Sequence, residues 1–370
     1  MLEARIHRSI HDIGREAWLA CAPGSLEGFD YLAAVEDANL AGFGWRYAIV
    51  EQGGRPVMVA PGFHTDYSLD TTLNPLARQA VAAMRRVAPR VFRLKLAAIG
   101  SPCTEDAGVS FHPDASHEQR PAILRAGLEA FLADARREGC GLYAIKDAPQ
   151  PDEQLWNETA GTFGFARAAG LPTAILEIDF TSLEGYLARL SAATRKDMRR
   201  KLKAMDELEI ETRTEIGDVA DRVMELYGMT RMRADMQFEN LTRTYFTGVM
   251  DRMPNRALCV LYRERGSGDI IAANLLVHDD QTLLDKFFCS EDARGRANNL
   301  YFVSWIQNVR LCLELGLRRY QSGQAGYANK LRLGSRLIGS SMYFRHRNPI
   351  VNSTLRLAAP LLSEERPEAA

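Results

Sequence analysis

Leu283-Leu284-Asp285-Lys286-Phe287-Phe288-Cys289 opens the stretch that decides the fold, which extends to Gly334. The apolar run predicts a buried strand, and a polar loop of small residues follows it from Ser290 to Asn299. The next residues predict a helix from about Leu300 to Leu315, because apolar side chains recur there at steps of three and four. Strand, polar loop and helix therefore follow one another without interruption.

A glycine-rich turn completes this stretch. Gly316 stands where a glycine commonly ends a helix, and a short strand is predicted from Arg318 to Gln321. The turn itself reads Gly323-Gln324-Ala325-Gly326-Tyr327-Ala328-Asn329-Lys330. Free backbone N–H groups at a helix start bind phosphate or a pyrophosphate arm. A tyrosine and a lysine nearby can handle protons and developing negative charge.

Length and composition limit the classes of protein that fit. The 370 residues indicate two domains or one large one, and 46% hydrophobic residues are enough for extensive cores. The net charge of −1 gives the whole molecule no electrostatic reason to bind nucleic acid, so such binding would need a local basic patch.

Cysteine spacing and hydropathy indicate a cytoplasmic protein without a membrane span. The six cysteines form no CxxC pair, so we expect reduced, buried thiols and no metal site. No apolar run approaches the roughly 18 residues that cross a bilayer. The first ten residues carry charges and no apolar h-region, which predicts that no signal peptide is present.

The first half of the chain repeats the order of elements found in the second. Its sequence predicts a hairpin over residues 45–61, a helix over 76–87, a strand over 91–98, a helix over 121–138 and a strand over 142–146. The second half has a hairpin over residues 257–277 before the deciding stretch. We therefore predict an α/β protein of two tandem lobes, each a mixed, partly antiparallel sheet flanked by helices. The expected bounds are 1–175 and 176–355, with a disordered tail over 356–370.

A basic helix begins the second half. Arg195, Lys196, Arg199, Arg200, Lys201 and Lys203 place six cations in nine residues, in adjacent stripes. Like charges so placed repel, and a phosphate or nucleic-acid partner would recover that cost. The alternative is a solvated face that pairs with Asp206, Glu207 and Glu209.

Several motifs follow one another in an order and spacing that identify a family only when taken together. They are Phe29-Asp30-Tyr31-Leu32-Ala33-Ala34-Val35-Glu36 with Gly44-Trp45, Tyr186-Leu187-Ala188-Arg189-Leu190-Ser191, Arg195-Lys196-Asp197-Met198-Arg199-Arg200, Tyr227-Gly228-Met229-Thr230-Arg231-Met232-Arg233, Tyr245-Phe246, Asn299-Leu300-Tyr301 and the turn from Gly323 to Lys330. In this order the chain resembles a tandem GNAT N-acyltransferase, similar to the Fem-type peptidoglycan aminoacyltransferases and the predicted bacterial N-acyltransferases. The GNAT fold runs hairpin, strand, pyrophosphate-binding loop and helix, strand.

The resemblance and the local patterns together suggest site residues. We expect Lys330, as the functional lysine of the Fem-type turn, and Tyr327, as a proton donor, to be catalytic, with Lys330 facing water in the free protein. Surface and packing roles are the alternatives for these two. The expected donor-binding residues are Phe288, Cys289, Arg294, Gly295, Asn298 and Asn299, although a buried thiol and ordinary helix capping would also explain Cys289 and the two asparagines. The expected acceptor-binding residues are Arg195, Arg199, Tyr227, Arg233 and Gly323, with core packing as the alternative for Tyr227.

The resemblance implies transfer of an acyl group from an acyl-CoA-type thioester to an amine acceptor, with no bound cofactor. The acyl-CoA loop of the fold usually reads Arg/Gln-x-x-Gly-x-Gly/Ala, and the best match here, residues 292–297, begins with Asp292. Aminoacyl-tRNA users also show a degenerate loop, so transfer from aminoacyl-tRNA to a cell-wall precursor is the alternative. A binding module for an anionic ligand, without turnover, is a third. The approach of the loop around Gly295 to a pyrophosphate separates these hypotheses.

Overall fold

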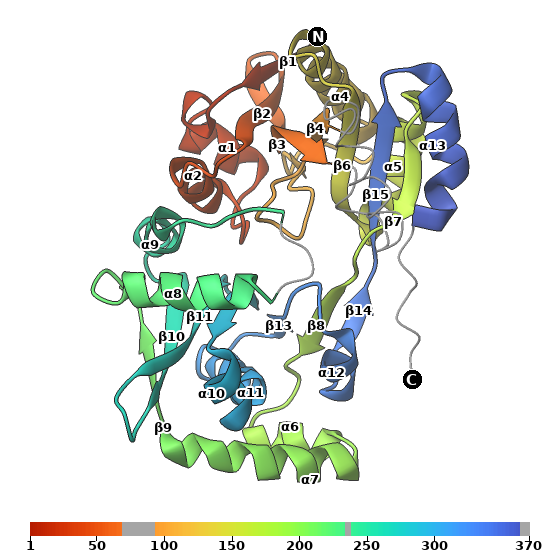
Figure 1. Ribbon diagram of the computed structural model, residues 1–370. Coiled ribbons are helices and arrows are strands. Elements are labelled where there is room, and N and C mark those ends of the chain that lie inside the picture. Colours follow the sequence, from red (N-terminus) through yellow and green to blue (C-terminus); the bar gives the residue numbers. More distant parts are fainter. Residues whose placement is uncertain (69–92, 234–237, 363–370) are drawn as a thin grey trace, which may run out of the picture. The chain divides into compact units, whose positions relative to one another are not determined.

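The computed structural model of the chain describes residues 1–68, 93–233 and 238–362, which fold into two units with one mixed sheet each (Figure 1). The first unit comprises Met1–Leu171 and the segment that begins at Gly339, and the second comprises Pro172–Ile338. This division differs from the expected bounds of 1–175 and 176–355. The reason is strand β15 (Ser340–His346), which returns to the first unit and pairs there with two strands.

The first sheet has the strand order β1-β2-β3-β4-β6-β15-β7, and β5 pairs with β3. Strands β4 and β6 are parallel neighbours, and the other pairs are antiparallel. The bounds of the strands are β1 Leu2–His7, β2 Phe43–Gln52, β3 Arg55–Ser68, β4 Arg93–Ile99, β5 Ser110–Phe111, β6 Leu142–Pro149 and β7 Ala166–Ala169. The predicted hairpin and the two predicted strands of this half are therefore present.

Helices cover this sheet. They are α1 (Arg15–Cys21), α2 (Phe29–Asp37), α4 (Arg120–Arg137), α5 (Glu153–Thr162) and α13 (Pro349–Leu362). Helix α4 packs its Ile123, Leu128 and Phe131 into the core formed with the sheet. The helix predicted over residues 76–87 lies outside the described residues. Helix α13 includes residues 356–362 of the expected tail.

The second sheet has the strand order β14-β8-β13-β12-β11-β10-β9. Only β12 and β13 are parallel neighbours in this path. The strands are β8 Thr173–Glu177, β9 Leu208–Arg213, β10 Ala257–Glu264, β11 Ile270–His278, β12 Thr282–Ser290, β13 Arg319–Gln321 and β14 Arg336–Ile338. The predicted hairpin corresponds to β10 and β11, and the predicted strand of the deciding stretch corresponds to β12.

Helices lie on both faces of the second sheet (Figure 1). Helices α8 (Ala220–Arg231) and α9 (Arg243–Arg252) cover one face, and α6 (Leu183–Arg189), α7 (Ala192–Lys201), α10 (Asp292–Ala297) and α11 (Leu300–Glu314) lie on the other. Helix α12 (Tyr327–Arg332) follows β13. The two mixed sheets flanked by helices confirm the predicted α/β tandem arrangement.

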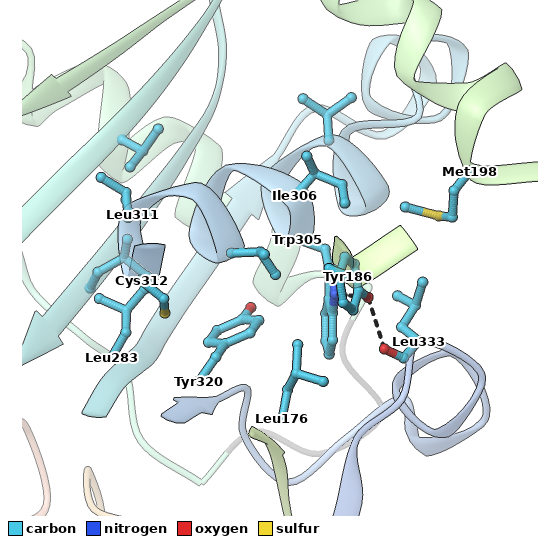
Figure 2. Close-up of a cluster of buried hydrophobic side chains, with 14 of the residues drawn as sticks. Leu176, Tyr186, Met198, Leu283, Trp305, Ile306, Leu311, Cys312, Tyr320 and Leu333 are labelled. Atoms are coloured by element: carbon cyan, nitrogen blue, oxygen red, sulfur yellow. Dashed lines mark hydrogen bonds between the residues drawn. The ribbon is translucent and has the colours of Figure 1, made fainter. Parts of the chain in front are cut away.

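Helix α11 forms the centre of the core of the second unit. Figure 2 shows Trp305, Ile306, Leu311 and Cys312 of α11 gathered with Leu283 and Tyr320 of the sheet. Trp305 Nε1 donates a hydrogen bond to the hydroxyl of Tyr186 at 2.9 Å, and this hydroxyl donates to the carbonyl of Leu333 at 2.8 Å. These two hydrogen bonds connect α11, the helix predicted from apolar periodicity, to α6 and to the end of α12.

Candidate functional site

Strand β13 ends after a short parallel contact with β12, which leaves a gap in the sheet beside the rest of β12. The two strands pair only over residues 282–284 and 319–321, although β12 continues to Ser290. Beyond Leu284, therefore, β12 has a neighbouring strand on one side only among the residues that the structure describes. The chain leaves β13 at Gln321 and enters the glycine-rich turn, which places this turn beside the gap.

A β-bulge at Lys286 sets which side chains of β12 face α11. Leu276 of β11 lies opposite Asp285 and Leu275 lies opposite Phe287, so Lys286 is an extra residue. Without it, Asp285 and Phe288 would point to opposite faces of the sheet, because side chains alternate along a strand. With it, Asp285 bonds to α11 and Phe288 packs against the core of the same face. The bulge thereby brings both side chains to one site.

A pocket of about 300 Å³ lies where β12 passes through α10 into α11. Three of the predicted donor-binding residues, Phe288, Gly295 and Asn299, line it. A Cβ atom at position 295 would lie 3.1 Å from Ser290 Oγ, so the absence of a side chain there allows α10 to approach the strand. The full lining is Lys201, Phe288, Ser290, Asp292, Gly295, Arg296, Asn299, Leu300, Tyr301 and Phe302.

The start of α11 gives the pocket hydrogen-bond donors. Asn299 is the N-cap, with a left-handed φ of 51°, and its side chain makes no capping hydrogen bond. Its carbonyl accepts from the N–H groups of Phe302 and Val303, while within the described residues the N–H groups of Leu300 and Tyr301 have no acceptor. Such free N–H groups at the positive end of a helix are suited to an anion.

Two cations border the same pocket. Arg296 is largely exposed and pairs with Asp292 one turn earlier in α10. Lys201, at the end of α7, lies with its Nζ 3.3 Å from the centre of the Phe302 ring and 2.9 Å from Asp197. Asp292, which replaces the usual Arg or Gln of the loop, is thus neutralised by a neighbouring arginine. The pocket can therefore accept a phosphate group despite that replacement.

A polar cluster lies on the α11 face of the second sheet, at the edge of the gap beside β12. Asp285 Oδ2 accepts hydrogen bonds from Tyr320 at 3.0 Å, Asn308 at 3.1 Å and Asn274 at 3.3 Å. Burial raises the pKa of this carboxyl to about 6, against the opposing effect of these hydrogen bonds and of Lys330. At neutral pH, Asp285 is therefore mostly ionised but close to its midpoint.

The predicted catalytic lysine is buried. Lys330 is 4% exposed, and its Nζ donates to the carbonyls of Ser322 and Gly323, the latter at 3.1 Å. The expectation that it faces water is therefore wrong, because the turn folds around it. Gly323, predicted to bind the acceptor, takes part through this carbonyl. Tyr327 donates a hydrogen bond to the carbonyl of Pro172 at 2.8 Å, which places its hydroxyl beside the start of β8.

Tyr301 connects the pocket with the polar cluster. It lines the pocket, and its hydroxyl lies 4.0 Å from the position that a Cβ atom would take at Gly326 of the turn. Burial and the nearby Asp285 raise the pKa of Tyr301 to about 12. Tyr301 therefore lines the pocket and also lies near the turn and Asp285.

Three predicted donor-binding residues lie elsewhere. Cys289 points to the other face of the sheet, where its Sγ donates to the carbonyl of Ala273, and burial raises the pKa of its thiol. Arg294 turns away from the pocket to pair with Glu264 and Asp269. Asn298 caps α10 through the carbonyl of Arg294. The alternative of a buried thiol thus describes Cys289, whereas Asn298 caps the end of α10 and not the start of α11.

The predicted acceptor residues are not brought together. Tyr227 is buried in the core on the α8 face, where its ring packs on Phe287 and its hydroxyl accepts from the N–H of Leu241. Arg195 donates to the carbonyls of Ala188 and Leu190, and Arg199 pairs with Glu184. Arg233 donates a hydrogen bond to the carbonyl of Ser290, a residue that lines the pocket. Only Arg233 and Gly323 therefore lie near the pocket or the turn.

The sequence patterns hardly indicated the polar cluster. Asn274 stands between apolar residues of β11, whereas Asp285 is followed by Lys286 and Asn308 is preceded by Gln307, and Tyr320 has the pattern of a core aromatic. The usable signal is the presence of polar residues inside three neighbouring apolar segments. Tyr301 belongs to the Asn299-Leu300-Tyr301 motif but is not among the expected site residues.

Comparison with known proteins identifies the family. The FemAB_like family model, described as peptidoglycan biosynthesis/recognition, matches residues 9–353. The crystal structure of FemX covers 96% of this chain and 100% of its own, with 14% identity and a TM-score of 0.61. A tandem GNAT protein from the clavulanic acid biosynthesis pathway covers 94% and 99%, with 14% identity and a TM-score of 0.56.

A curated relative is longer than this chain. The putative 8-amino-7-oxononanoate synthase 2 of Mycobacterium tuberculosis (strain H37Rv) is 22% identical over 335 residues, which are 89% of this chain and 43% of the relative. The chain thus spans less than half the length of that protein. None of the helices in the described residues is long and apolar enough to cross a membrane. The match of the family model over residues 9–353 shows that the chain belongs to the FemAB-like family.

Proposed function

We propose that this protein transfers an acyl group from an acyl-CoA-type thioester to an amine acceptor, with the donor bound by the second unit. The observation that carries the proposal is the gap beside β12, where β13 ends, next to a pocket at the start of α11. An acyl-CoA donor needs such an opening, because the acceptor must reach its thioester carbonyl from one side while its phosphates are held on the other. The family membership supports the same class of reaction.

The donor's pyrophosphate would bind at the start of α11. The N–H groups of Leu300 and Tyr301 supply hydrogen bonds, and Arg296 and Lys201 supply positive charge. The acyl end would then extend along Phe288 toward the gap. Because the groups that bind the donor are fixed by α11 and by the bulged strand, positioning supplies much of the rate.

In this proposal Lys330 acts by shaping the site. Its ammonium holds the carbonyls of Ser322 and Gly323, which fixes the turn next to the gap. It also lies close enough to Asp285 to favour the ionised carboxylate. Tyr327 would have to exchange its bond to Pro172 before it could protonate a leaving group.

Transfer from aminoacyl-tRNA to a cell-wall precursor is the second candidate. Two observations favour it: the family description names peptidoglycan biosynthesis, and α7, which ends beside the pocket at Lys201, carries exposed Lys196, Arg199 and Arg200. A nucleic-acid donor would use such a surface through its phosphates. The two candidates differ in donor but share the site around the gap.

Titration calorimetry with acetyl-CoA and with alanyl-tRNA separates the two donors. We expect acetyl-CoA to bind the wild type, and we expect Arg296→Gln to weaken it about tenfold, since a charge-assisted contact contributes on the order of 1.5 kcal/mol. Arg55→Gln is the matched control, because it removes an exposed cation from a hairpin turn of the other unit. Binding of alanyl-tRNA with no binding of acetyl-CoA would overturn the thioester proposal in favour of the second candidate.

A further inference from the structure

Helix α13 packs on the first sheet through one of its faces. It contacts β7 and β15, and its Leu355 joins the apolar cluster that contains Phe63 and Leu96 (Figure 1). Asn352 donates a hydrogen bond to the carbonyl of Gly164 at 3.0 Å. These contacts fix the orientation of α13 on the sheet, so its opposite face points away from the core of this unit.

That opposite face is apolar and exposed. Ile350 and Leu357 lie seven residues apart, which is two turns of helix, so their side chains share one face. They are 77% and 83% exposed, and Val351 beside them is 40% exposed. We call these three side chains the α13 patch. Large apolar side chains that gather on one exposed face of a helix indicate an interaction surface.

The segment that carries the α13 patch is positively charged. Residues 339–362 contain three arginines, Arg345, Arg347 and Arg356, and no aspartate or glutamate. Arg347 and Arg356 are exposed, and within the described part of the chain none of the three arginines pairs with a carboxylate. A surface that combines exposed apolar side chains with unpaired cations suits a partner that is both apolar and anionic.

We propose that the α13 patch docks on an anionic lipid surface. An interfacial helix buries its apolar face at the boundary between headgroups and acyl chains, and neighbouring arginines are attracted to the lipid phosphates. Helix α13 provides both kinds of side chain, and its packed face holds it on the sheet with the patch outward. This inference concerns the first unit and goes beyond the proposed acyl transfer.

A second copy of this chain fits the α13 patch less well. It would bring another Arg347 and Arg356 to the same surface, where the segment has no carboxylate to separate the like charges. A specific protein interface also involves roughly 20–30 residues on each side, whereas the patch has three apolar side chains. A lipid surface needs no matching shape, because acyl chains adapt to the side chains that enter them.

Vesicle flotation tests the inference with the full chain. The protein is mixed with vesicles of phosphatidylcholine, or of phosphatidylcholine with phosphatidylglycerol, and the bound fraction is measured at low and at high salt. We expect binding to the anionic vesicles, little binding to the neutral ones, and weaker binding at high salt because the arginines are screened. Ile350→Ser and Leu357→Ser should each lower the ratio of bound to free protein about tenfold, since each removes one large apolar side chain from the lipid.

Charge is tested by Arg347→Gln combined with Arg356→Gln, which should lower the same ratio about tenfold or more at low salt. Arg55→Gln combined with Arg136→Gln is the control, since both arginines are exposed on β3 and α4 of the same unit. Met232→Ser is the apolar control, because Met232 is 78% exposed in the second unit. Both controls should bind like the wild type. All these side chains are exposed, so each variant should keep the wild-type melting temperature.

The inference is wrong if the wild type does not float with the anionic vesicles, or if both serine variants float as the wild type does. An equal loss with Met232→Ser would mean that any exposed apolar side chain serves, and would also overturn it. A dimer in size-exclusion chromatography that Leu357→Ser converts to a monomer, without vesicle binding, would show that a second copy covers the patch instead. None of these results depends on acyl transfer, so the proposed function is tested separately.

Discussion

Lys330 combines a positive charge with almost complete burial. It is 4% exposed, and its ammonium bonds two carbonyls of the turn it closes. We predict that Lys330→Met lowers turnover about 10²-fold by displacing the turn and lowers the free energy of unfolding by about 1–3 kcal/mol, since buried carbonyls lose their donor. Urea unfolding and single-turnover kinetics measure the two effects.

Lys196→Met is the control for this prediction. Lys196 is exposed on α7, so its replacement should change the unfolding free energy by less than about 0.5 kcal/mol. If Lys330→Met were equally harmless to stability, the lysine would not hold the turn. A stability loss with unchanged turnover would separate the fold of the turn from catalysis.

At the scale of single residues, sequence reasoning placed some site residues and missed others for a physical reason. Gly295 and Asn299 could be placed because a loop between a strand and a helix has few possible positions. Asp285 could not be placed, because the direction of its side chain depends on the bulge at Lys286, and no residue pattern predicted that bulge. Arg294 and Arg296 look alike in sequence, yet only Arg296 lines the pocket, because acidic partners on the β10–β11 hairpin hold Arg294.

At the scale of elements, α7 presents its cations in two ways. Arg195 bonds the last carbonyls of α6, whereas Arg199 and Arg200 make exposed ion pairs with single carboxylates. We predict that Arg199→Gln with Arg200→Gln weakens an anionic donor in a salt-dependent way and changes stability by less than about 0.5 kcal/mol, because exposed pairs contribute little. Calorimetry at two salt concentrations measures the first effect.

Arg195→Gln is the comparison within the same helix. It should lower the melting temperature more than the double change does, since it removes hydrogen bonds that join α7 to α6. If the double variant binds the donor like the wild type at both salt concentrations, α7 is a solvated face. The sequence predicted the cationic stripe correctly but could not assign these separate roles, because they depend on the position of α6.

At the scale of the whole molecule, the order of elements predicted two mixed sheets, but contact with distant sequence set their limits. Strand β15 completes the first sheet between β6 and β7 after the chain has passed through the second unit. Buried and exposed residues alternate over the first part of β15 in the structure, but the sequence analysis did not predict this strand or the sheet it joins. The boundary expected at residue 355 therefore differs from the division in the structure.

This topology makes the first unit depend on residues near the end of the described chain. Tyr343 of β15 is 2% exposed, packs near Trp156 and donates a hydrogen bond to Asn157 at 2.7 Å. We predict that Tyr343→Ala costs about 3–5 kcal/mol, as for other large aromatic truncations. Hydrogen exchange should accelerate in β6, β7 and α5, while β10, β11 and α11 stay protected. Ile306→Ala, in the core of the second unit, should give the reverse pattern. Equal acceleration in both units by either variant would mean that they unfold as one.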